Sequence, residues 1–157
     1  MRVLMNDAVA ALIAMIRAAF SSPLPLPPAR LVTPGAWDTD DLVTALSSVP
    51  DMPGQHFVEA HFDSLPVLTH EGLRFVLPAF MIHSLNSPDS PATERVIFHL
   101  SPADAEQEYW RERIAVFSQP QRAAICRFLQ HLRGTTLGHG FEADLERATL
   151  VWNCASE

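Results

Sequence analysis

Histidines and carboxylates gather between residues 56 and 71, and both side-chain types bind divalent metals or exchange protons. The group consists of His56, Glu59, His61, Asp63, His70 and Glu71. Its spacing is poor for a metal, because His56 and His61 are five residues apart, or about 140° around a helix. The His-Glu-x-x-His motif is also absent. We therefore predict no metal site and no cofactor, and keep a small metal-dependent or His/carboxylate hydrolase using the His56–Glu71 cluster as the alternative function.

Other catalytic arrangements have little support in the sequence. His83 and His99 lie in apolar runs, where Glu71 or Glu94 could partner them in acid–base chemistry, although histidines at a core edge commonly make only one structural hydrogen bond. Gly-x-Ser-x-Gly is absent, which argues against a serine nucleophile. The chain contains no lysine, so a Gly-Lys-Ser/Thr phosphate loop and a lysine Schiff base are excluded. We predict no catalytic residue and favour a protein that is not an enzyme.

The acidic residues are distributed very unevenly. The 43 residues between Arg30 and Arg74 hold seven carboxylates and no basic residue, whereas the rest of the chain has eleven acids and eleven arginines. The formal net charge of −7 therefore belongs to this acidic segment. Such a field attracts a basic surface and repels nucleic acid and anionic membranes. The predicted partner-binding residues are Asp38, Asp40, Asp41, Asp51, Glu59, Asp63 and Glu71.

These charges predict a non-catalytic protein-binding module with a basic protein partner. An immunity or antitoxin-type inhibitor that covers the basic surface of a toxin fits this description, because opposite charge accelerates encounter. We predict no binding to nucleic acid or membrane, and the charges make no prediction of oligomeric state.

Composition and length indicate one folded domain. The chain has 157 residues, of which 48% are apolar and 18% charged, so disorder is disfavoured. The apolar run Ala8–Ile16 resembles the middle of a signal peptide, but Asp7 precedes it and Arg17 follows it. We therefore predict that this segment is a mature amphipathic helix and that the protein is cytoplasmic. Cys126 and Cys154 lack metal-ligand spacing, and reduced thiols are expected in that compartment.

Hydrophobic periodicity and capping residues predict most of the elements. The expected helices run from Asn6 to about Phe20, over Asp40–Ser48, from Thr69 to about Leu85, from after Pro102 to about Phe117, from Ser118 to Gly134, and over Phe141–Trp152. Residues 56–68 predict a short helical turn or an irregular segment. The 69–85 helix is apolar on nearly every face, which predicts a central position, and Pro78 predicts a kink within it.

Two segments are not expected to be helical. Residues 21–35 contain five prolines and predict an extended strap over the surface. Residues 95–100 are the only β-rich run. The predicted fold is mostly α: residues 1–157 form a compact single-domain bundle of about five to six helices, with a kinked central helix and at most one short strand pair.

Two blocks of the sequence resemble a known family. They are LTHEGLRFVLPAFM at 68–81 and FSQPQRAAI at 117–125, within which Leu-Pro-Ala-Phe-Met and Phe-Ser-x-x-Gln are the most specific parts. They are similar to a bacterial family of small, acidic, single-domain proteins of unknown function, whose pattern has proline in place of His70 and an aromatic residue in place of Val76. The resemblance spans about residues 9–132 and implies a self-standing, mostly helical module. It assigns no catalytic or binding residue.

Overall fold

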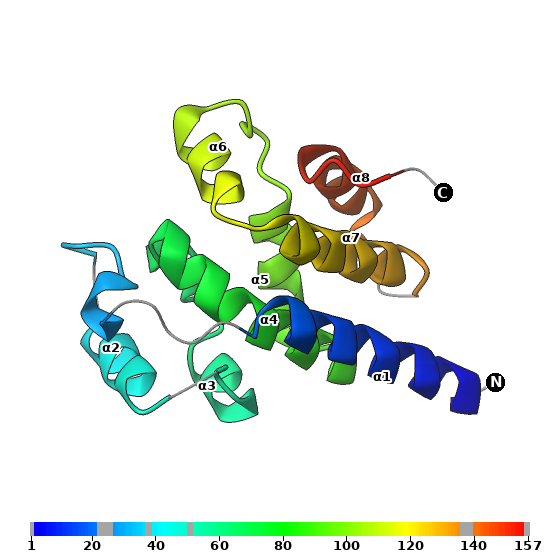
Figure 1. The fold of residues 1–157 in the computed structure, drawn as a ribbon, viewed down its shortest axis with the longest axis horizontal. Coiled ribbons are helices and arrows are strands. Elements are labelled where there is room, and N and C mark those ends of the chain that lie inside the picture. The colour runs from blue at the N-terminus through cyan, green and yellow to red at the C-terminus, as the bar shows by residue number, and fades with distance from the viewer. Residues whose placement is uncertain (1, 22–26, 37–38, 50–51, 136–139, 156–157) are drawn as a thin grey trace.

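The fold consists of helices, as Figure 1 shows. The computed structural model describes residues 2–21, 27–36, 39–49, 52–135 and 140–155. Within these ranges the elements are α1 (Arg2–Ala19), η1 (Pro28–Arg30), α2 (Asp40–Ser47), α3 (Gln55–Ala60), η2 (Leu65–Val67), α4 (His70–Asn86), α5 (Pro91–Leu100), α6 (Glu108–Ala115), α7 (Gln119–Arg133) and α8 (Glu142–Val151). The mostly helical class is confirmed, but the described residues form eight α-helices rather than five or six.

Helix α4 is the central element, as predicted. Val76, Leu77, Phe80 and Met81 have no exposed surface, and twelve of its 17 residues are buried. Helices α1, α3, α5 and α6 all pack against it. Thr69 caps its first turn by accepting a hydrogen bond from the Gly72 N–H at 3.0 Å. Pro78 does not divide α4, which is assigned as one helix, and a kink there stays a prediction.

The β-rich run at 95–100 is helical, which corrects the sequence-based expectation. Ser90 caps α5 by accepting from the Ala92 N–H, and Pro91 occupies its first position, which needs no donor. Val96, Ile97 and Leu100 are fully buried, and this helical spacing faces the core. Tertiary burial therefore outweighs the β preference of this segment. No strand pair forms in the described residues, where the only bridge joins Val32 and Leu68.

The proline-rich strap is also partly different from the prediction. Residues 22–26 lie outside the described ranges, but Pro28–Arg30 form a 3₁₀ turn, and Leu31 and Val32 are buried rather than spread over the surface. The strap is attached to the start of α4, because the Thr69 N–H donates to the Leu31 carbonyl at 2.9 Å. A Cβ on Gly72 would overlap the backbone carbonyl of Leu31, so this contact requires glycine.

Helices α7 and α8 pack against each other, and they also pack against α1 and α5, respectively. Helix α7 lies between α1 and α8 and packs against both (Figure 1). It begins with the predicted capping box, in which the Gln121 N–H donates to Ser118 Oγ and the Ser118 N–H donates to Gln121 Oε1. Helix α1 begins at Arg2 rather than after Asn6, since no Gly or Pro interrupts residues 2–5. Among the described helices, none combines the length and the apolar character needed to cross a membrane.

Candidate protein-binding surface

The acidic segment supplies three exposed carboxylates on two helices. Asp40 and Asp41 are exposed in the first turn of α2, and Glu59 is exposed on α3. Both helices lie on the side of the molecule away from α8 (Figure 1). No arginine in the described ranges forms an ion pair with any of the three, and Glu59 Oε1 only accepts a hydrogen bond from the Gln55 amide at 2.8 Å. We call Asp40, Asp41 and Glu59 the acidic end.

The other predicted contacts are placed differently. Arg95 Nε lies 3.1 Å from Asp63 Oδ1, and Arg74 Nη2 lies 2.6 Å from Glu71 Oε2, so both carboxylates are already paired with arginines of the same chain. Both arginines come from outside the acidic segment or from its boundary. Asp38 and Asp51 lie outside the described residues. The structure therefore separates the carboxylates of the acidic segment that pair with arginines from those that do not. The charge count alone does not make this distinction.

The His56–Glu71 cluster does not form a common site. His56 is exposed, the His61 ring packs on the Phe57 ring with centroids 4.9 Å apart, and Asp63 pairs with Arg95. No group of three or more potential metal ligands exists among the described residues. The carboxylates and imidazoles that are close in sequence therefore point to different neighbours.

His83 and His99 are not paired with Glu71 or Glu94, in contrast to the arrangement considered from the sequence. His83 Nε2 lies 2.9 Å from Ser90 Oγ, at the cap of α5. His99 Nε2 accepts a hydrogen bond from Arg113 Nε at 3.1 Å. Glu71 instead binds Arg74, and Glu94 is exposed. Both histidines therefore have structural partners.

A buried arginine on α6 is the main polar feature that sequence analysis missed. Arg113 is only 1% exposed. Its Nη2 donates to the Leu65 carbonyl and its Nη1 to the Leu68 carbonyl, each at 2.9 Å. Nη1 also lies 3.3 Å from His70 Nδ1, which must be the acceptor because a guanidinium only donates. Arg113 therefore ties α6 to η2 and to the start of α4.

The environment of Arg113 explains how a charge is held in the interior. Burial lowers the pKa of the guanidinium, and interaction with Tyr109 opposes this shift. The Tyr109 ring centroid is 5.5 Å from the Arg113 Cζ, in cation–π range. A sequence signal for burial existed: Trp110, Arg113, Ile114 and Phe117 follow the spacing i, i+3, i+4, i+7, which places Arg113 on the inward face.

The same surroundings of Arg113 keep the His99 ring neutral. Burial, together with the neighbouring Arg113 charge, lowers its pKa from 6.5 to about 3. Because Nε2 accepts from Arg113, the ring proton is on Nδ1. A histidine that stays neutral down to strongly acidic pH does not serve as an acid–base group near pH 7.

We expect the His99 environment to make the protein less stable in acid. Below pH 6.5 the unfolded chain binds a proton at this residue, whereas the folded protein binds it only near pH 3. Stability is therefore complete above pH 6.5 and falls as the pH decreases, by about 2 kcal/mol from this residue between pH 7 and pH 5. Burial also lowers the pKa of His131, which adds a contribution of the same sign.

The measurement is urea unfolding of wild type and His99→Gln at pH 7 and pH 5. Glutamine keeps an acceptor for Arg113 but does not titrate, so the variant should lose less stability than wild type over this interval. Equal losses in the two proteins would contradict the role assigned to His99.

Most of the chain matches a known protein family. A family model, described as a family of unknown function (DUF6714), matches residues 36–149, from just before α2 to within α8. The chain belongs to DUF6714. No curated protein matches the chain, and no solved structure matches it. The DUF6714 region contains the acidic end and Arg113, whereas all of α1, η1 and the residues after Thr149 lie outside it.

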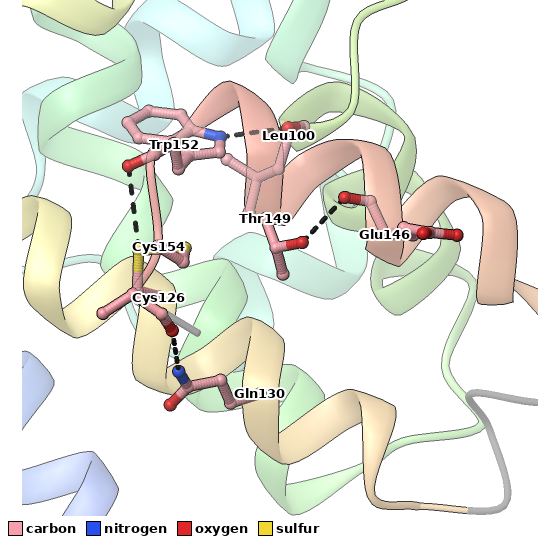
Figure 2. The surroundings of a disulfide bond; sticks show 8 residues. Leu100, Cys126, Gln130, Glu146, Thr149, Trp152 and Cys154 are labelled. Carbon is pink, nitrogen blue, oxygen red and sulfur yellow. Dashed lines mark hydrogen bonds between the residues drawn. A yellow bond between two sulfur atoms is a disulfide. The ribbon is translucent and has the colours of Figure 1, made fainter. Parts of the chain in front are cut away.

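The two cysteines form a disulfide, which corrects the expectation of reduced thiols. Cys126 lies on α7 inside the DUF6714 region, and Cys154 follows α8 outside it (Figure 2). The chain turns after α8 because Asn153 adopts a left-handed conformation with φ of 53°. The Asn153 N–H donates to the Leu150 carbonyl and the Cys154 N–H to the Thr149 carbonyl, which is a Schellman ending. This turn brings Cys154 onto α7, a contact that sequence spacing does not reveal.

Proposed function

We propose that this DUF6714 protein is a non-catalytic binding module whose acidic end contacts a basic surface on a protein partner. The observation that carries the proposal is the contrast within the acidic segment: Asp40, Asp41 and Glu59 are exposed without an arginine partner in the described ranges, whereas Asp63 and Glu71 each pair with an arginine. Unpaired surface carboxylates generate the field that accelerates association with a cationic protein. Asp38 and Asp51 remain candidate contacts on sequence grounds.

An immunity-type inhibitor of a cationic toxin is the specific form that we propose for this module. Such a protein must associate quickly and cover a basic surface, and it needs no catalytic group of its own. The proposal also includes a bacterial origin, as the sequence resemblance implies. The hydrolase alternative receives no support from the described geometry, in which His56, His61 and Asp63 point to separate neighbours.

A cytoplasmic location belongs to the same proposal. The amphipathic pattern of α1 supports it, because Leu12 and Ile16 face the core as part of the fold. Disulfides are rare in that compartment, so the redox state of Cys126 and Cys154 in cells is the direct test. Alkylation of intact cells that traps both thiols in free form would support the location, and a fully oxidised pair would argue for an oxidising compartment.

We expect reversal of the acidic end to abolish capture of the partner. The test variant is Asp40→Arg, Asp41→Arg, Glu59→Arg, used as bait in a lysate of the source organism at low salt. The control is Asp104→Arg, Glu106→Arg, Glu146→Arg, which makes the same charge change at exposed positions elsewhere. Wild type and control should retain the same basic protein, and the acidic-end variant should lose it.

The kinetics of the captured complex provide a second readout. The acidic-end variant should associate at least about tenfold more slowly than wild type at low salt, with a flatter salt dependence. Equal thermal stability of the variants would show that the loss is not due to unfolding. A partner whose contact surface is acidic, or binding that survives the acidic-end reversal unchanged, would refute the proposal.

A further inference from the structure

The disulfide lies at the edge of a cavity. Cys126 and Cys154 are both partly exposed, and both line a cavity of about 370 Å³ between α7, α1 and the segment after α8. Arg122 and Arg127 of α7 line the same cavity. The sulfur atoms are therefore placed where a thiol in solution can approach them, along a cavity that Arg122 also lines.

The segment after α8 has few other attachments to α7. The Gln130 side-chain amide donates to the Ala155 carbonyl at 3.5 Å, and Cys126 Sγ lies 3.8 Å from the Trp152 carbonyl oxygen. Figure 2 shows these contacts beside the disulfide. The amide contact is at the long limit for a hydrogen bond, and the disulfide sulfur has no hydrogen to donate, so the covalent link is the principal connection between residues 153–155 and α7.

Helix α8 itself is held independently of the disulfide. The Trp152 indole N–H donates to the Leu100 carbonyl at 3.0 Å, and Arg147 Nε donates to the Ser101 carbonyl at 2.7 Å. Leu145 and Ala148 are fully buried. Loss of the disulfide should therefore free the end of the chain without removing α8 from the core.

We propose that the Cys126–Cys154 disulfide is a redox-sensitive clasp that holds residues 153–155 in place as one wall of this cavity. In the oxidised protein residues 153–155 are fixed across the edge of α7. In the reduced protein they separate from α7 and the cavity opens toward α1, while the DUF6714 core remains folded.

The chemistry is thiol–disulfide exchange with a dithiol reductant. A thiolate of the reductant attacks one of the two sulfurs, the Cys126–Cys154 bond breaks, and the other cysteine leaves as a thiolate. The second thiol of the reductant then resolves the mixed disulfide. Two electrons pass to the protein, two cysteine thiols form after protonation, and the dithiol becomes a disulfide.

Arg122 favours this exchange. Arg122 is fixed beside the cavity, because its Nε donates to the Phe117 carbonyl at 3.1 Å and its Nη2 to the Ile114 carbonyl at 3.4 Å. It precedes Cys126 by one helical turn, on the same face of α7. Because Arg122 lines the cavity that the disulfide borders, its positive charge favours the approach of an attacking thiolate through that cavity.

Hydrogen exchange of the full chain, with and without dithiothreitol, tests the clasp. Reduction should accelerate exchange of the Asn153 and Cys154 amides by about tenfold or more, because the turn that joins them to the Leu150 and Thr149 carbonyls opens once Cys154 is released from α7, and it should leave amides of α4 unchanged. The Cys126→Ser, Cys154→Ser double variant should match the reduced protein and should not respond to dithiothreitol. Loss of protection throughout α4 would show that the disulfide is a global staple instead. Unchanged exchange after verified reduction, or resistance to reduction without denaturant, would also overturn the proposal.

Thiols of opposite charge test the role of Arg122. Mercaptoethanesulfonate, an anion, should reduce the disulfide at least about threefold faster than cysteamine, a cation, after correction for thiolate fraction, and added salt should remove the difference. A faster reaction with cysteamine would contradict the role assigned to Arg122.

Discussion

Replacement of Arg113 by methionine should destabilise the protein by about 3–5 kcal/mol, because it removes a buried charge network and leaves its partners unpaired. The Leu65 and Leu68 carbonyls and His99 Nε2 would each lose a donor. Methionine has a similar length, so most of the loss would come from hydrogen bonding rather than from a cavity. The measurement is the free energy of unfolding in urea.

The same helix provides a matched control. Arg111 is exposed and lies two residues before Arg113, so Arg111→Met should change stability by less than about 0.5 kcal/mol. Arg113→Lys should recover only part of the loss, because a single ammonium group does not reproduce the planar guanidinium that reaches two carbonyls and two histidines. If Arg113→Met and Arg111→Met had equal effects, the cluster would not contribute to stability.

Replacement of Phe80 by alanine should cost about 3–5 kcal/mol, since it removes a fully buried ring from the middle of α4. The surrounding helices are fixed by their own contacts and can collapse only partly into the space. Phe98→Ala on α5 is the control, because that ring is 73% exposed and should contribute little. Thermal unfolding of both variants would distinguish them, and a small effect at Phe80 would contradict the central position of α4.

Different residues are expected to determine stability and partner binding. Arg113 and Phe80 lie in the interior, whereas Asp40, Asp41 and Glu59 lie on the surface. Variants of the interior should lower the free energy of unfolding without changing the charge of the acidic end. Reversal of the acidic end should change association without a comparable loss of stability.

Local patterns in the sequence determined the helical class and several boundaries. Thr69 before α4 and the Ser118–Gln121 capping box were predictable, because a cap depends on residues within one turn of the helix. The all-round hydrophobicity of residues 73–85 likewise predicted the central helix. The confinement of the net charge to the segment before Arg74 also follows from the sequence alone.

The tertiary structure decided the contacts between distant residues. Arg113 bonds to carbonyls 45 and 48 residues away, Cys126 pairs with Cys154 over 28 residues, and residues 91–100 become a helix because their buried face meets α4. The pairing of Asp63 with Arg95, which restricts the acidic end, is likewise non-local. Charge counts and capping patterns depend only on residues that are close in sequence. The packing of the helices decides which distant charges, thiols and carbonyls come into contact.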